Sequence, residues 1–211
     1  MSERTGGLRR ILGAPWVYRL YQALANRPDT WSRMVDRYVR PWPGAAILDI
    51  GCGPGTILDV MPEGVSYLGL DRNSSYIEEA RRRYGSRGTF LEQDVTDLPA
   101  AERSFDLVMA FGLLHHVDDD GARAVMTAVS QRLRPGGRLI TLDPVFVDGQ
   151  SAMARWIAAN DRGRFVRSPE GYRSLAETAL PAVTVEILHD LLRIPFSSIV
   201  MICGTGDQER P

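Results

Sequence analysis

Short apolar runs alternate with amphipathic stretches along the central part of the chain. Apolar residues recur at helical spacing in 74–84 and 122–133. The apolar runs around these stretches predict buried strands at 46–50, 65–70, 89–91, 105–111 and 138–142. Alternation of this kind is typical of βαβ units, in which helices connect parallel strands. The pattern therefore predicts an α/β fold with a mostly parallel sheet.

Both ends of the chain depart from this alternation. Residues 16–24 and 30–39 have helical spacing, and Pro41-Trp42-Pro43-Gly44 predicts a turn before the first strand. After residue 143 the alternation lapses, and two β-rich runs follow at 183–188 and 194–203. Because the link between these runs is too short for a parallel crossover, we expect them to pair antiparallel at one sheet edge.

Composition narrows the function classes. A formal net charge of -1 and a pI near 6.3 disfavour a protein that binds bulk nucleic acid. All 25 basic side chains are Arg, so Lys chemistry such as Schiff-base formation is excluded. Two cysteines, Cys52 and Cys203, lack zinc-site spacing and predict a cytoplasmic protein. No apolar stretch is long enough to predict a membrane span, and we expect no metal, because Asp118-Asp119-Asp120 precede a predicted helix whose N-terminus favours carboxylates.

A glycine-rich loop follows the first predicted strand. Gly51, Gly53 and Gly55 would bring backbone N–H groups close to a ligand. Asp71 ends the next strand 20 residues after Gly51, where a carboxylate can accept hydrogen bonds from the ribose of an adenosine. As an alternative, Asp71 would cap the helix that begins near Asn73. A dinucleotide fingerprint requires glycine at the position of Thr56, which disfavours NAD.

The loop and four further motifs resemble class I methyltransferases. The first motif is Ile47-Leu48-Asp49-Ile50-Gly51-Cys52-Gly53-Pro54-Gly55, and the others follow in order through residues 45–143: Leu68-Gly69-Leu70-Asp71, Glu92-Gln93-Asp94-Val95, Phe105-Asp106-Leu107-Val108 and Leu133-Arg134-Pro135-Gly136-Gly137. The resemblance implies a Rossmann-like three-layer sandwich, with a mostly parallel seven-stranded sheet, an antiparallel edge strand, N-terminal helices and a helical insertion after the fifth strand. We expect a single domain with an N-terminal arm (1–44), a cofactor-binding core (45–143), an insertion or lid (144–181) and C-terminal strands (182–204).

The resemblance also implies S-adenosylmethionine as cofactor and a role for each motif residue. Asp49, Gly51, Cys52 and Gly53 would border the methionine part. Asp71 would bind the ribose, with Arg72 beside it. Asp94 would accept a hydrogen bond from the adenine amino group and the backbone of Val95 would meet the ring, although Asp94 also suits a turn before Thr96. Phe111 would offer its carbonyl to the methionine ammonium.

The sequence Leu113-Leu114-His115-His116-Val117 follows the fourth strand and resembles small-molecule methyltransferases at the place where substrate meets the methyl group. An imidazole there suits a general base, since its ordinary pKa is near 6.5. A positioning or packing role for His115 and His116 is the alternative. Because adjacent residues point in different directions, we expect at most one of them to face the methyl group.

Two arginine-rich segments lie outside the core. Residues 1–40 have a balance of +5, from eight Arg and three acids, and residues 151–173 have +3, from five Arg and two acids. These charges favour an anionic acceptor bound by Arg164 and Arg167, or they form a solvated basic face. Aromatic residues such as Tyr18 and Tyr21 would line an acceptor pocket or pack in the core.

We therefore expect methyl transfer to a small organic acceptor, in secondary or specialised metabolism. A nucleobase acceptor is disfavoured, because Ala110-Phe111-Gly112-Leu113 departs from the Asp/Asn-Pro-Pro-aromatic motif of base-modifying enzymes. A cyclase or isomerase that keeps the methyl group, and a non-catalytic cofactor-binding module, are the alternatives. The sequence leaves the oligomeric state open.

Overall fold

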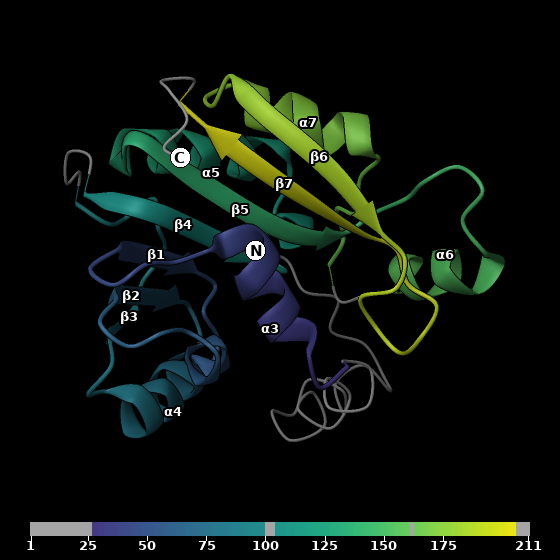
Figure 1. Ribbon diagram of the computed structural model, residues 1–211. Coiled ribbons are helices and arrows are strands. Elements are labelled where there is room, and N and C mark those ends of the chain that lie inside the picture. Colours follow the sequence, from purple (N-terminus) through teal and green to yellow (C-terminus); the bar gives the residue numbers. More distant parts are fainter. Residues whose placement is uncertain (1–26, 100–103, 161–162, 206–211) are drawn as a thin grey trace.

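The computed structural model describes residues 27–99, 104–160 and 163–205. In these residues seven strands form one sheet in the order β3-β2-β1-β4-β5-β7-β6 (Figure 1). The strands are β1 Ala46–Ile50, β2 Ser66–Asp71, β3 Thr89–Glu92, β4 Phe105–Phe111, β5 Leu133–Pro144, β6 Ala182–Leu188 and β7 Ser198–Gly204. Neighbours from β3 to β5 are parallel, whereas β7 runs antiparallel to both β5 and β6. The predicted mixed sheet is confirmed, with the antiparallel β6–β7 pair at its edge.

The strand order places a binding site at the centre of the sheet. β1 pairs with β2 on one side and with β4 on the other. Strands β1 to β3 therefore follow one another toward one edge of the sheet, and the strands from β4 onward lie on the other side of β1. Ligands of open parallel sheets bind outside the carboxyl ends of the strands at such a reversal of strand order. We therefore expect a ligand to bind at the loops after Ile50 and Phe111.

Helices cover both faces of the sheet (Figure 1). The elements are α3 Thr30–Met34, the π-type turn η1 Val35–Val39, the 3-10 turns η2 Thr56–Asp59 and η3 Leu114–His116, and α4 Ser74–Tyr84, α5 Asp119–Arg132, α6 Ala152–Ala159 and α7 Pro169–Glu177. One apolar cluster joins α5 and α7 to the sheet through residues such as Val125 and Tyr172. The other joins α3, η1 and α4 to the opposite face through Met34 and Ile77. Burial of these two faces produces the three layers.

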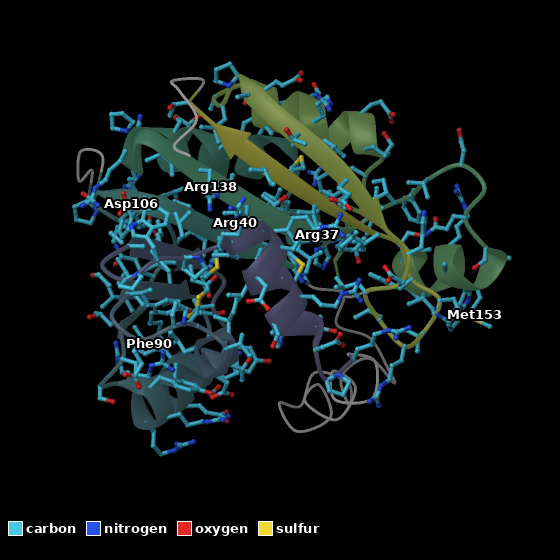
Figure 2. The ribbon with its side chains drawn as sticks, in the orientation of Figure 1. Arg37, Arg40, Phe90, Asp106, Arg138 and Met153 are labelled. Atoms are coloured by element: carbon cyan, nitrogen blue, oxygen red, sulfur yellow. The ribbon has the colours of Figure 1, made fainter. Side chains whose placement is uncertain are left out.

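The glycine loop is followed by the short turn η2, because few residues separate it from β2 and Pro62 within them lacks an N–H donor. One strand differs from the prediction. β5 begins at Leu133, not at Arg138, and its register with β4 shifts between Phe105 and Leu107. Arg134 of β5 pairs with the buried Asp106 of β4, with Nη1 2.6 Å from Oδ2 (Figure 2 labels Asp106).

Ion pairs fasten the N-terminal helix to the far edge of the sheet. Arg33 pairs with Asp190 at 3.0 Å and Arg37 pairs with Glu186 of β6 at 2.6 Å. The predicted helix over 30–39 is confirmed, although its second half has π-type hydrogen bonding. The other predicted helix, 16–24, lies outside the described residues.

The insertion after β5 contains α6 and α7. α7 packs into the core, whereas α6 lies at the outer side of the molecule, with Met153 57% and Trp156 64% exposed (Figures 1 and 2). Within the three described ranges, no helix has the length and apolar character needed to cross a bilayer.

Candidate cofactor and methyl-transfer site

The glycine loop folds back over the end of β2. Gly51, Gly53 and Gly55 have φ of 77°, 55° and 75°, a region that favours glycine. The N–H groups of Gly51 and Cys52 both donate to the Leu70 carbonyl, at 2.7 and 3.0 Å. A Cβ added to Gly53 would meet nothing within 4 Å, so the backbone there faces open space. This leaves a surface on which a ligand can lie against the backbone.

Asp71 joins this loop to the start of α4. Its Oδ2 accepts a hydrogen bond from the Gly53 N–H at 2.9 Å, and its Oδ1 accepts one from the Asn73 N–H at 2.8 Å. The helix cap is Asn73, whose side chain accepts from the N–H groups of Ser75 and Tyr76. Burial raises the pKa of Asp71, while these backbone hydrogen bonds oppose the rise. Each carboxylate oxygen keeps acceptor capacity for a ribose hydroxyl.

Asp49 is buried beneath the loop and pairs with Tyr67 of β2. The Tyr67 hydroxyl donates to Asp49 Oδ2 at 2.5 Å, and the residue Asp49 is 5% exposed. Burial raises the pKa of Asp49 to about 7, the Tyr67 hydrogen bond lowers it, and the charge of Asp71 raises it further. Sequence reasoning missed Tyr67, because an aromatic residue in a strand reads as core.

Cys52 packs against Gly69 of β2, at a position where any larger residue would collide with the Cys52 side chain. A Cβ on Gly69 of β2 would come within 2.8 Å of Cys52 Sγ and 3.0 Å of the Phe90 ring. Burial raises the pKa of the Cys52 thiol, which therefore stays protonated. Cys52 thus helps to seat the loop on the sheet, as a packing group and not as a nucleophile.

Asp94 and Arg72 lie together at the carboxyl ends of β3 and β2. Asp94 Oδ1 accepts from the N–H and hydroxyl of Thr96, at 3.0 and 2.9 Å, so the turn expected as an alternative is present. Its other oxygen lies 3.8 Å from Arg72 Nη1. Val95 is 1% exposed and packs into the core. The turn leaves Oδ2 of Asp94 as the oxygen suited to an adenine amino group.

Phe111 ends β4 and stacks on Trp31 of the N-terminal helix. The ring centroids are 6.0 Å apart and the planes meet at 9°. This contact brings the N-terminal arm to the carboxyl end of the central strand. Trp31 was not among the candidate residues, although it lies in the segment with helical spacing.

The two histidines form the turn η3 immediately after β4. His115 is 5% exposed, and its Nδ1 lies 2.8 Å from Oδ1 of Asp143, a 2%-exposed residue near the end of β5. The same Oδ1 accepts the backbone N–H of His115 at 3.1 Å, which identifies it as an acceptor and favours a proton on Nδ1. The His116 ring lies beside the His115 ring with centroids 4.1 Å apart, in a 3-10 turn that takes the place of a regular strand or helix. That at most one of the two rings faces the methyl group stays a prediction.

Burial of Asp143 has an electrostatic consequence. Burial raises the pKa of this carboxyl, and His115 opposes the rise. Oδ2 of Asp143 has no hydrogen-bond partner among the described residues. An imidazole oriented by a buried carboxylate is the arrangement that a general base requires. Sequence reasoning missed Asp143, since it closes a strand and carries no motif of its own.

Two of the predicted acceptor residues, Arg164 and Arg167, lie in the described part of the chain. The guanidinium of Arg167 is hydrogen-bonded inside the protein to Asp119 and to three backbone carbonyls. These bonds use the donors that an anionic acceptor would need, which is a correction to the role expected for Arg167. Arg164 is exposed, next to this segment. Tyr18 and Tyr21 lie outside the described residues.

These features define a class of protein. The glycine loop of β1, Asp71 of β2, Phe111 of β4 and the Asp143–His115 pair all lie at carboxyl ends of neighbouring strands. A carboxylate beside an open glycine backbone fits an adenosine-containing cofactor, and the histidine pair adds a group for proton transfer. In the described part of the chain no cluster of three or more His, Cys, Asp or Glu side chains could hold a metal ion. The fold is that of a Rossmann-like domain, and the residues at its strand ends fit a nucleoside cofactor.

Part of the chain is similar to known methyltransferases. Residues 47–137 match a family model described as a methyltransferase domain. An O-methyltransferase of Pyrenophora dematioidea is 36% identical over 128 residues, covering 56% of this chain and 47% of that protein. A ubiquinone/menaquinone biosynthesis C-methyltransferase of Desulfotalea psychrophila is 28% identical over 209 residues, covering 85% of this chain and 81% of that protein.

Solved structures agree with the fold. A geranyl diphosphate methyltransferase in complex with GPP and sinefungin superimposes with a TM-score of 0.66 at 16% identity, covering 82% of this chain and 75% of the other. The chain is similar to methyltransferases over residues 47–137 and shares the Rossmann-like fold of this structure. It spans less than half the length of the curated O-methyltransferases that match it at 36% identity.

Proposed function

We propose that the protein transfers a methyl group from S-adenosylmethionine to a small organic acceptor. The observation that carries this proposal is the hydrogen bond from Gly53 N–H to Asp71 Oδ2 beside the open face of Gly53. It sets a ribose-binding carboxylate next to a backbone that a ligand can approach. Bound there, S-adenosylmethionine supplies an activated methyl group on its sulfonium.

The residues around the loop suit the parts of this cofactor. In the proposal, Asp71 accepts from the ribose hydroxyls with Arg72 beside it, and Asp94 and the backbone of Val95 hold the adenine. The methionine part lies along Gly51, Cys52 and Gly53, its ammonium near the Phe111 carbonyl and the buried Asp49. A cation close to Asp49 would favour the ionised carboxylate.

His115 is the group we propose as general base. With Nδ1 donating to Asp143, the lone pair of the neutral ring is on Nε2. With the cofactor bound, Nε2 would take the proton that an O–H or C–H of the acceptor loses on methylation, and the buried Asp143 would stabilise the resulting imidazolium. An acceptor with an acidic O–H or C–H fits this arrangement, and the relatives named above, an O-methyltransferase and a C-methyltransferase, agree with such an acceptor.

The first experiment measures cofactor binding and product mass. Calorimetry should show S-adenosylmethionine binding to the wild-type protein, and incubation with phenolic quinone precursors should give a product heavier by one CH2. His115→Gln and Asp143→Asn should lower kcat by about 100-fold or more while cofactor affinity stays nearly unchanged. A product of unchanged mass would indicate cyclisation or isomerisation. Cofactor binding with no turnover on any acceptor would indicate a non-catalytic module.

A further inference from the structure

The insertion residues 163–167, called here the clamp segment, lie directly against the histidine turn η3. The Phe165 N–H donates to the His115 carbonyl at 3.0 Å. The Arg167 guanidinium donates to the carbonyls of Leu114 and Val117, both at 2.8 Å. The clamp segment is therefore hydrogen-bonded to the backbone before, at and after His115.

Arg167 uses all of its donors in this position. Nε and Nη2 donate to Asp119 Oδ1 at 2.9 and 2.8 Å, and the carbonyl of Phe165 accepts from Nη1 at 2.9 Å. With the Leu114 and Val117 carbonyls, the guanidinium makes five hydrogen bonds to four acceptor atoms, which matches its five N–H groups. The side chain is 10% exposed and its charge is balanced by Asp119 in the first turn of α5. A planar group satisfied at every donor holds its neighbours in one geometry.

The backbone of Arg167 also contacts the residues that follow Asp143, the carboxylate partner of His115. The Phe146 N–H donates to the Arg167 carbonyl at 3.1 Å, and Val145 pairs with Arg167 in an isolated parallel bridge. Both residues follow Asp143 closely along the chain. One residue thus connects the turn that holds the imidazole with the strand end that holds its carboxylate.

Gly163 completes the contact on the ring itself. A Cβ at this position would lie 2.0 Å from His115 Cδ2 and 2.5 Å from the His115 carbonyl oxygen. Such separations leave no room for any side chain. The clamp segment therefore touches the imidazole directly, and its glycine permits that approach.

We infer that Arg167 and Gly163 are positioning residues, which hold the His115 ring on Asp143 and so fix the proton on Nδ1. Arg167 holds the clamp segment on the turn η3 by hydrogen bonds, and Gly163 allows the segment to lie directly against the His115 ring. Neither residue acts on the acceptor. This inference deepens the proposed function, on which its consequence for catalysis rests, whereas the orientation of the ring is a property of the protein alone.

Ring-nitrogen spectroscopy tests the inference without any substrate. The chain has three histidines, so a two-bond proton–nitrogen correlation spectrum resolves each ring, assigned with single His→Gln variants. In the wild type, His115 should show a protonated Nδ1 and an unprotonated Nε2. In Arg167→Gln and in Gly163→Ala, both signals should move toward the average of the two tautomers. His189, bonded through Nδ1 to Ser197 Oγ at 3.0 Å, should keep its signals and report an intact fold.

Kinetics supply the second measurement. Both variants should lower kcat by about tenfold or more, as expected when a reacting group loses its alignment, while cofactor affinity stays at the wild-type value. Arg173→Gln is the matched control, because this exposed arginine of the same insertion pairs only at the surface with Glu177 and the Val183 carbonyl. It should match the wild type in both measurements.

The outcomes separate the two hypotheses. If Arg167→Gln keeps the fold, and its His115 signals and kcat equal those of the wild type, the inference is wrong. If Arg167→Gln does not fold, Gly163→Ala decides by the same measurements. A wild-type protein without methyl transfer would overturn the proposed function, yet the His115 signals would still confirm or contradict the clamp.

Discussion

At the scale of single residues, Asp71 combines two tasks. It accepts backbone hydrogen bonds from Gly53 and Asn73 and, in the proposed function, from the ribose. Asp71→Ala should weaken S-adenosylmethionine binding by about 1.5 to 3 kcal/mol, the range for hydrogen bonds to a charged group. Calorimetry measures this change, with the exposed Glu63→Ala as control. Unchanged affinity in a folded Asp71→Ala variant would contradict the ribose assignment.

Asp49 should make the stability of the cofactor-free protein depend on pH. Burial raises its pKa to about 7, whereas an unfolded aspartate titrates near 3.9. Between these two pH values Asp49 is protonated in the native state and ionised in the unfolded state. The native state therefore binds more protons, and the free energy of unfolding falls as pH rises. The contribution is complete below about pH 4 and is lost as pH passes through about 7.

The measurement is urea unfolding at several pH values with and without this carboxyl. Asp49→Asn keeps an acceptor for Tyr67 but cannot ionise, so its stability should fall less between about pH 5 and pH 8 than that of the wild type. Burial also raises the pKa of Asp71 and Asp143, which add dependence of the same sign in both proteins. Equal slopes for wild type and variant would show that Asp49 ionises normally.

At the scale of elements, the glycine loop sits on β2 because Gly69 has no side chain. Gly69→Ala would drive a Cβ to 2.8 Å from Cys52 Sγ and 3.0 Å from Phe90, and should cost about 1 to 3 kcal/mol of stability, as overpacking does. The double variant Cys52→Ala/Gly69→Ala removes the sulfur and should recover part of this loss. Chemical denaturation of the four proteins in the cycle gives the coupling. Additive losses would mean that the contact with Cys52 does not matter.

At the scale of the whole molecule, the N-terminal helix meets the centre of the sheet at the site. Trp31 stacks on Phe111, whose carbonyl is proposed to face the cofactor ammonium. Addition of S-adenosylhomocysteine should therefore change the tryptophan fluorescence of the wild type. Trp31→Phe should abolish this change, while Trp156→Phe should retain it, because Trp156 is 64% exposed on α6. A change that persists in Trp31→Phe would place the cofactor away from this stack.

Much of the molecule was determined by the sequence alone. Strands β1 and β4 and helix α4 match their predicted bounds, because hydrophobic periodicity acts locally and the buried faces repeat at the period of each element. The glycine loop and Asp71 were predicted for the same reason, since a loop after one strand and a carboxylate ending the next meet wherever two strands are parallel neighbours.

Only the tertiary structure decided how the remaining side chains pair. His115 meets Asp143 from 28 residues away, Tyr67 meets Asp49 from 18, and Arg167 meets Asp119 from 48. Each partner lies in a different element, so no spacing along the chain indicates the contact. The arginine expected to bind an acceptor instead fastens the insertion, because the order of strands brings the end of β5 beside the turn after β4, and burial there requires every donor to be satisfied within the protein.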